Sequence, residues 1–197
     1  MAKTKGRAKK GAGEPLADGF QLKITLHESQ PPIWRRVIVP VNLTLEGLHI
    51  VIQTAMGWSD DHLLQFEIGE TRYTGSHPFD DFDDTGEDDS QYRLDEAIGN
   101  KKKFRYEYDF GDSWQHTIVV EKRIPNTGQP IKIVCTGGEM CCPLEDSGGL
   151  WGYYEKIAIL NDKTHPEHEE IAEWLGSFDP ELFDINAANK SLARLTR

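Results

Sequence analysis

Residues 104–120 read FRYEYDFGDSWQHTIVV, and this stretch determines how the rest of the chain can fold. Alternate positions are aromatic or apolar on both sides of a polar centre, which is the pattern of a β-hairpin with one buried face. The turn carries two carboxylates, Asp109 and Asp112, and is followed by an indole at Trp114 and an imidazole at His116. The stretch therefore predicts both the middle of a sheet and a candidate site.

The length of the turn decides which side chains share a face of this hairpin. A three-residue turn places Tyr108 opposite His116 and Phe110 opposite Trp114, whereas a two-residue turn places Glu107 opposite His116. The first register forms one aromatic face, in which each Å² of buried apolar surface contributes about 25 cal/mol, while an exposed ion pair contributes about 1 kcal/mol or less. We therefore expect the Tyr108–His116 pairing, with His116 as a partly buried imidazole hydrogen-bonded to a neighbour. At the turn, Asp112 is expected to accept local backbone N–H bonds.

Strand patterns occupy most of the chain up to residue 134, and helix patterns dominate after it. The expected strands or hairpins are 20–26, 33–39, 63–73, 104–124 and 131–134. The expected helices are Leu45–Met56, with Thr44 as the cap and Gly57 at the end, then a turn at 94–98, and 150–160, 166–175 and 185–195. This order predicts an α+β fold, an antiparallel sheet with helices packed on one face, in a single compact domain.

Charge is distributed unevenly along the 197 residues. Five of the 22 basic residues and none of the 33 acidic ones lie within residues 1–13. We therefore expect a disordered basic tail over residues 1–15, followed by an acidic domain over 16–197 that repels the phosphate backbone of nucleic acids. Residues 80–89 contain seven carboxylates and predict an exposed acidic loop, in which half of an EF-hand pattern appears without its closing Glu.

The chain shows no pattern of export or membrane insertion. It has no apolar core of a secretory signal and no run of about 18 apolar residues. Three cysteines, two of them adjacent, do not form the spaced set of a disulfide-rich secreted domain. A cytoplasmic location with reduced thiols and no membrane partner is expected.

One set of residues offers ligands for a metal. His116, Cys135 and Cys142 are three candidates, and a tetrahedral zinc site needs a fourth, for which Asp112, Cys141 or Glu145 is available. The spacing Cys-x5-Cys-Cys is not that of a zinc knuckle. We therefore expect no cofactor, and buried thiols are favoured over zinc.

A second set has the composition of a binding site. It combines the hairpin turn with the loop that opens the helix at residue 150, and its members are Asp109, Asp112, Trp114, Glu145 and Asp146. Trp114 is expected to offer a stacking surface, and the carboxylates favour a cationic or polyhydroxylated ligand or a basic segment of a partner protein. The chain has no Gly-x-Ser-x-Gly elbow, His-Glu-x-x-His helix or dinucleotide fingerprint, which favours binding over catalysis.

Several segments in a fixed order resemble the plasmid pRiA open-reading-frame-three family, also known as insertion-element passenger proteins. They are Pro31–Arg36, Leu48–Trp58, Tyr108–His116, Cys135–Tyr153, and Asp179-Pro180 with Phe183-Asp184. The resemblance implies a single compact α+β domain, an association with mobile elements and no assigned catalytic residues. The family motif Pro-Pro-Glu-Asp appears as Pro143-Leu144-Glu145-Asp146, so its two carboxylates are retained and its second proline is not.

Three hypotheses of function follow. The first is a binding or protein-interaction module that uses the acidic and aromatic site. The second is a metal-dependent enzyme that uses the His, Cys and carboxylate set. The third is association with nucleic acid through the basic tail.

Overall fold

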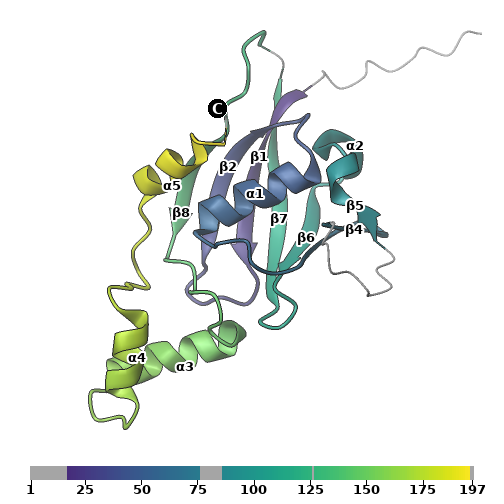
Figure 1. The fold of residues 1–197 in the computed structure, drawn as a ribbon. Coiled ribbons are helices and arrows are strands. Elements are labelled where there is room, and N and C mark those ends of the chain that lie inside the picture. The colour runs from purple at the N-terminus through teal and green to yellow at the C-terminus, as the bar shows by residue number, and fades with distance from the viewer. Residues whose placement is uncertain (1–16, 76–85, 126, 196–197) are drawn as a thin grey trace, which may run out of the picture.

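An eight-stranded sheet forms the centre of the protein, in the order β5-β4-β3-β6-β7-β1-β2-β8 (Figure 1). This computed structural model describes residues 17–75, 86–125 and 127–195. Neighbouring strands are antiparallel, except for the short β4–β5 pair, which is parallel. The expected α+β class is confirmed, and the parallel edge pair makes the sheet mixed.

The elements follow the order that the sequence patterns indicate. The strands are β1 (Ala17–Leu26), β2 (Trp34–Pro40), β3 (Leu64–Ile68), β4 (Thr71–Thr74), β5 (Glu87–Asp88), β6 (Lys103–Tyr108), β7 (Trp114–Pro125) and β8 (Val134–Glu139). The helices are α1 (Leu45–Met56), α2 (Leu94–Ile98), α3 (Gly149–Asn161), α4 (His168–Leu175) and α5 (Ile185–Leu192), with a 3₁₀ turn at Asp89–Gln91.

Helix α1 lies across one face of the sheet and has the expected bounds (Figure 1). The Thr44 side chain accepts a hydrogen bond from the Gly47 N–H, and Gly57 closes the helix in the left-handed conformation. Such caps satisfy N–H and C=O groups that a helix end leaves without partners. The two caps therefore fix the point at which the chain enters the loop 58–63.

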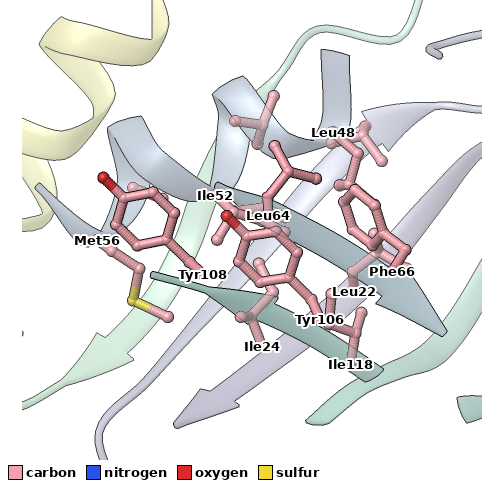
Figure 2. Close-up of a cluster of buried hydrophobic side chains, with 14 of the residues drawn as sticks. Leu22, Ile24, Leu48, Ile52, Met56, Leu64, Phe66, Tyr106, Tyr108 and Ile118 are labelled. Carbon is pink, nitrogen blue, oxygen red and sulfur yellow. The ribbon is translucent and has the colours of Figure 1, made fainter. Parts of the chain in front are cut away.

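The core lies between α1 and the strands beneath it. Figure 2 shows apolar side chains of α1 pointing at alternate residues of the sheet, namely Leu48, Ile52 and Met56 against Leu22, Ile24, Leu64, Phe66, Tyr106, Tyr108 and Ile118. Tyr106, Tyr108 and Trp114 are fully buried. A buried ring of this size removes about 150–250 Å² from water, so these three rings are a large part of the driving force for folding.

The β6–β7 hairpin has the expected face but a different register. Tyr108 pairs with Trp114 and Tyr106 pairs with His116, so the turn spans the five residues 109–113 and the expected Tyr108–His116 pairing is wrong by two residues. The aromatic face persists because a shift of two residues keeps every side chain on its side of the sheet. Phe110 leaves that face and lies half-exposed in the turn.

The last strand also differs from expectation. A strand was expected at 131–134 and a loop after it, but β8 covers Val134–Glu139 and pairs with β2. Its glycines permit close approach by bulky neighbours, since a Cβ on Gly138 would clash with the Phe183 ring. Glycine within a strand commonly marks such an approach.

Helices α3 and α4 pack together beyond one end of the sheet, while α5 lies beside α1 and β8 (Figure 1). Among the described residues, no helix is long and apolar enough to cross a bilayer. The expected cytoplasmic location stays a prediction. The basic tail at 1–15 and most of the acidic loop at 80–89 lie outside the described residues, and so does the tail-based hypothesis of nucleic-acid binding. In the described part of the loop, Glu87–Asp88 forms β5 and Asp89 is buried, so the expected exposure is wrong for Asp89.

Candidate functional site

The turn after β6 is organised by Asp109. This residue has a positive φ of 56°, and its Oδ1 accepts the N–H groups of Gly111 at 2.9 Å and Asp112 at 3.3 Å. The turn was expected to depend on the Asp112 carboxylate, but Asp109 has this role, because an Asp side chain reaches N–H groups two or three residues further on. The second oxygen of Asp109, Oδ2, is left free to face the neighbouring loop.

The loop before α3 docks against this turn. Gly148 N–H donates to Asp112 Oδ2 at 3.1 Å, and a Cβ on Gly149 would lie 2.6 Å from the Asp112 carbonyl oxygen. The indole Nε1 of Trp58 donates to the Pro143 carbonyl at 2.9 Å. The hairpin turn and the loop 143–149 therefore converge, as the predicted binding site requires.

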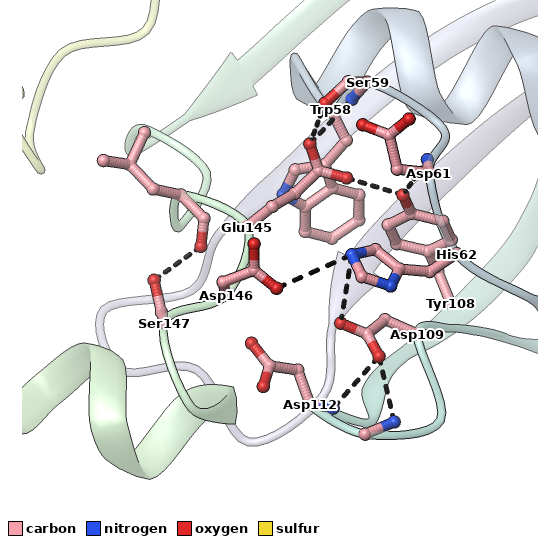
Figure 3. A network of polar contacts seen from close by, with 12 residues as sticks. Trp58, Ser59, Asp61, His62, Tyr108, Asp109, Asp112, Glu145, Asp146 and Ser147 are labelled. Carbon is pink, nitrogen blue, oxygen red and sulfur yellow. Dashed lines mark hydrogen bonds and ion pairs between the residues drawn. The ribbon is translucent and has the colours of Figure 1, made fainter.

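Glu145 is held at the centre of this junction (Figure 3). Its carboxylate accepts hydrogen bonds from Tyr108 Oη at 2.5 Å, from the Ser59 N–H at 2.9 Å and from the Ser59 hydroxyl. Burial opposes ionisation of Glu145, but these bonds outweigh it and lower the pKa of the carboxyl group. Burial, followed by the bond to Glu145, raises the pKa of Tyr108, so the carboxylate is the charged partner and the phenol stays neutral.

His62 joins two of the predicted carboxylates. Its Nε2 lies 3.7 Å from Asp109 Oδ2 and 3.7 Å from Asp146 Oδ1, and Figure 3 shows the three side chains pointing toward one another. The three ligand atoms come from three separate segments and lie within 4.8 Å of one another. Asp109 is buried, whereas Asp146 is largely exposed, so the group is open to solvent on one side.

The group has nearly the spacing of a metal site. Two ligand atoms about 2.1 Å from a divalent cation lie about 3.0 Å apart at right angles and about 3.4 Å apart in a tetrahedron. A contraction of a few tenths of an ångström would bring both 3.7 Å distances to a tetrahedral value, and the exposed Asp146 would turn so that the carboxylate oxygens, which lie within 4.8 Å of each other, reach the same ion. The N–H bonds to Asp109 Oδ1 hold its Oδ2 in place, as outer hydrogen bonds do for metal ligands.

Of the five predicted site residues, four lie at this junction and one does not take its expected role. Asp109 and Asp146 face His62, Asp112 fixes the loop, and Glu145 is the acceptor for Tyr108 and Ser59. Trp114 is fully buried and cannot stack on a ligand, because Trp58 covers it at a ring distance of 5.8 Å.

The predicted metal set of His116, Cys135 and Cys142 is not brought together. Within the part of the chain that the structure describes, the one group able to share an ion is that of His62. His116 lies on β7 and Cys135 on β8, with β1 and β2 between them, which separates the two strands by about 14 Å at the usual spacing of neighbouring strands. His116 also lacks the expected hydrogen bond, since neither ring nitrogen has a partner among the described residues.

The cysteines surround a buried arginine instead. Arg35 is almost fully buried and donates to the carbonyls of Ala55 at 3.0 Å and Glu139 at 2.9 Å. Burial raises the pKa values of Cys135 and Cys142, and the positive charge of Arg35 opposes this shift only in part. Both thiols are therefore protonated at neutral pH, which fits the expected buried thiols.

Comparison with known proteins places the chain in a family. The model of the plasmid pRiA4b ORF-3-like proteins matches residues 18–187. The chain belongs to this family. It is 39% identical over 180 residues to the uncharacterized protein y4hQ of Sinorhizobium fredii, with 89% of each chain covered. A crystal structure of a Methanosarcina mazei protein of unknown function, MM3350, superposes with a TM-score of 0.77 at 35% identity, covering 85% of this chain and 96% of that one.

Proposed function

We propose that this family member is a binding module that takes one divalent metal ion through His62, Asp109 and Asp146. The observation that carries the proposal is the convergence of two carboxylates on a single imidazole nitrogen at equal distances of 3.7 Å. Nε2 carries at most one proton, and a hydrogen bond would bring one carboxylate to about 2.7–3.2 Å. Equal separations without a short hydrogen bond leave both carboxylate oxygens and the imidazole nitrogen available to a shared ion.

The ligand chemistry indicates the class of metal. Imidazole and carboxylate ligands together suit zinc, manganese or iron, whereas magnesium and calcium favour all-oxygen sites. Three protein ligands leave positions for water or for an oxygen of a bound molecule. The exposure of Asp146 gives such a molecule access to the site.

The surrounding charge indicates what binds beside the metal. Asp61, Asp112 and Glu145 lie around the triad, so the region stays acidic even with a divalent ion in place (Figure 3). Phosphate groups would be repelled by these carboxylates. A polyhydroxylated small molecule, or a basic segment of a partner protein, fits this charge, and this is the partner class we propose for the metal-loaded site.

Calorimetric titration of the full chain with Mn²⁺, Zn²⁺, Mg²⁺ and Ca²⁺, after removal of bound metal by chelator and dialysis, tests the proposal. We expect one equivalent of Zn²⁺ or Mn²⁺ to bind more tightly than Mg²⁺ or Ca²⁺. Asp109→Asn and Asp146→Asn should each weaken this binding about tenfold or more. Asn at position 109 retains the Oδ1 acceptor of the turn, so this variant should fold.

Asp61→Asn is the matched control, because it removes one charge from the same acidic region without removing one of the three ligands. Its affinity for metal should stay close to that of the unmodified protein. Equal loss of affinity in all three variants would show that the acidic region attracts cations in general and that the three proposed ligands do not form a specific site. Failure of the unmodified protein to bind any of the four ions at millimolar concentration would end the proposal.

A further inference from the structure

A cavity of about 260 Å³ lies between α1, the start of β3 and the 3₁₀ turn at Asp89–Gln91. Three carboxylates line it, from Glu46 on α1, Asp60 in the loop 58–63 and Asp89 in the 3₁₀ turn. Ile50, Leu63 and Leu64 form an apolar part of the wall. No lysine or arginine of the described chain lines this cavity.

Asp89 is the unusual member of this lining. The residue is 98% buried, and its Oδ2 has no hydrogen-bond partner among the described residues. That oxygen lies 3.9 Å from the position of a Cβ on Gly75, which is another lining residue. A buried carboxylate oxygen without a donor is costly, so a group that donates to it from the cavity would stabilise the protein.

The negative charge of the cavity is not neutralised from within. Asp60 lies 2.5 Å from His49 Nε2, but burial lowers the pKa of His49, so the imidazole is neutral at pH 7 and leaves the charge of Asp60 in place. Burial, together with the charges of Glu46, Asp88 and Asp60, raises the pKa of Asp89 to about 7. The carboxylates around Asp89 therefore destabilise its ionised form, and a cation bound beside it would stabilise that form.

We propose that this cavity binds a small organic cation, an ammonium or guanidinium group carried on a short alkyl chain. The cationic head would donate to Asp89 Oδ2, and the alkyl chain would lie against Ile50, Leu63 and Leu64. A bare metal ion does not fit, because among the described residues only His62, Asp109 and Asp146 are close enough together to share one. The volume is slightly below the range of about 300–1,000 Å³ usual for drug-sized ligands, which suits a short chain.

Cation binding at this position should release protons. A positive head group beside Asp89 favours the ionised carboxylate, so ligand binding lowers the pKa of Asp89 from about 7. Near pH 7 about half of the Asp89 side chains hold a proton before binding. The binding enthalpy should therefore depend on the ionisation enthalpy of the buffer, with a release of up to about half a proton.

Calorimetric titration of the full chain with butane-1,4-diamine and with agmatine, at low ionic strength, tests the proposal and distinguishes the two head groups. Butane-1,4-diol is the neutral control and should not bind. Asp89→Asn should weaken binding of the preferred cation at least tenfold and abolish proton release. Ile50→Phe, which fills the cavity without changing charge, should weaken it as well.

Glu70→Gln removes one exposed carboxylate in the β3–β4 turn and should leave the affinity unchanged. Far-UV circular dichroism and thermal unfolding establish that each variant folds. Binding of neither cation at millimolar concentration, or equal binding by Asp89→Asn, Ile50→Phe and the unmodified protein, overturns the proposal. Metal binding at His62 has no part in this test, so the two proposals stand or fall separately.

Discussion

Replacement of His116 by leucine should make the protein less sensitive to acid. The imidazole is fully buried between the rings of Trp58 and Tyr106, each 5.4 Å away, and neither nitrogen has a partner at hydrogen-bonding geometry among the described residues. Burial lowers the pKa of His116 to about 3, and the backbone groups of Trp114 and Tyr106 oppose this shift only in part. Leucine retains much of the volume and removes the ionisable group.

The magnitude follows from the two pKa values. In the unfolded chain the pKa of histidine is about 6.5, so as pH falls below that value the unfolded state takes up a proton that the folded state does not. The free energy of unfolding then decreases by about 1.4 kcal/mol for each pH unit between about 6.5 and about 3. Between pH 7.5 and pH 4.5 the loss due to His116 is about 2.7 kcal/mol.

Urea unfolding of the unmodified protein and of His116→Leu at pH 7.5 and pH 4.5 measures this difference. Carboxylates titrate in both proteins, so only the change in the gap between their free energies of unfolding reports on His116. His27→Gln, which removes an exposed imidazole, is the control for the loss of a histidine at the surface. A gap that stays constant between the two pH values would refute the assignment of a strongly lowered pKa to His116.

Two further substitutions test the junction of the site. Gly149→Ala places a Cβ 2.6 Å from the Asp112 carbonyl oxygen at a residue whose φ is 68°, so it should cost about 1–3 kcal/mol in urea unfolding and weaken metal binding. Gly176→Ala, at a φ of 57° with open space around it, should show the smaller cost of strain alone and leave metal binding intact. Tyr108→Phe removes one donor to Glu145, which should cost about 1–3 kcal/mol and raise the pKa of that carboxyl group, as measured by urea unfolding and carbon-detected NMR titration.

Helix α1 could be predicted to the residue because its signals are local. The spacing of its apolar residues lies within the helix itself. The hydroxyl of Thr44 and the glycine at position 57 each lie at the helix end that they define. The alternation on β6 and β7 is similarly local and gave the correct buried face. In such elements the sequence contains both the pattern and its boundaries.

The register of the hairpin could not be predicted by the same reasoning. Turns of two and three residues were compared, whereas the chain uses five, with Asp109 and Ser113 both at positive φ. Residues with a side chain seldom adopt that conformation, and here the carboxylate of Asp109 and the contact with the loop 143–149 stabilise it. The turn therefore depends on a segment more than thirty residues further along the chain.

His62 was missed for the same reason. It follows Asp60 and Asp61 in a loop with no motif around it, and only the fold brings it to Asp109 and Asp146. The one signal in the sequence was the run of polar residues 59–62 directly after α1. Because Gly57 ends the helix above the sheet, the residues that follow it have a defined position. Carboxylates could be assigned to the site from their loops, but the imidazole that joins them required the tertiary structure.

The loop 58–63 connects the two proposed sites. Asp60 points to His49 and the cavity of Asp89, the Asp61 N–H donates to Tyr108 Oη at 3.0 Å, and His62 faces the triad. Asp60 and His62 lie two residues apart in this loop, so a shift of His62 toward its two carboxylates on metal binding would also displace Asp60. Two bound cations would also repel each other, and the negative charge that remains between the sites reduces this repulsion. Each proposal is tested by itself, and the loop 58–63 is the segment through which occupancy of one site would alter the affinity of the other.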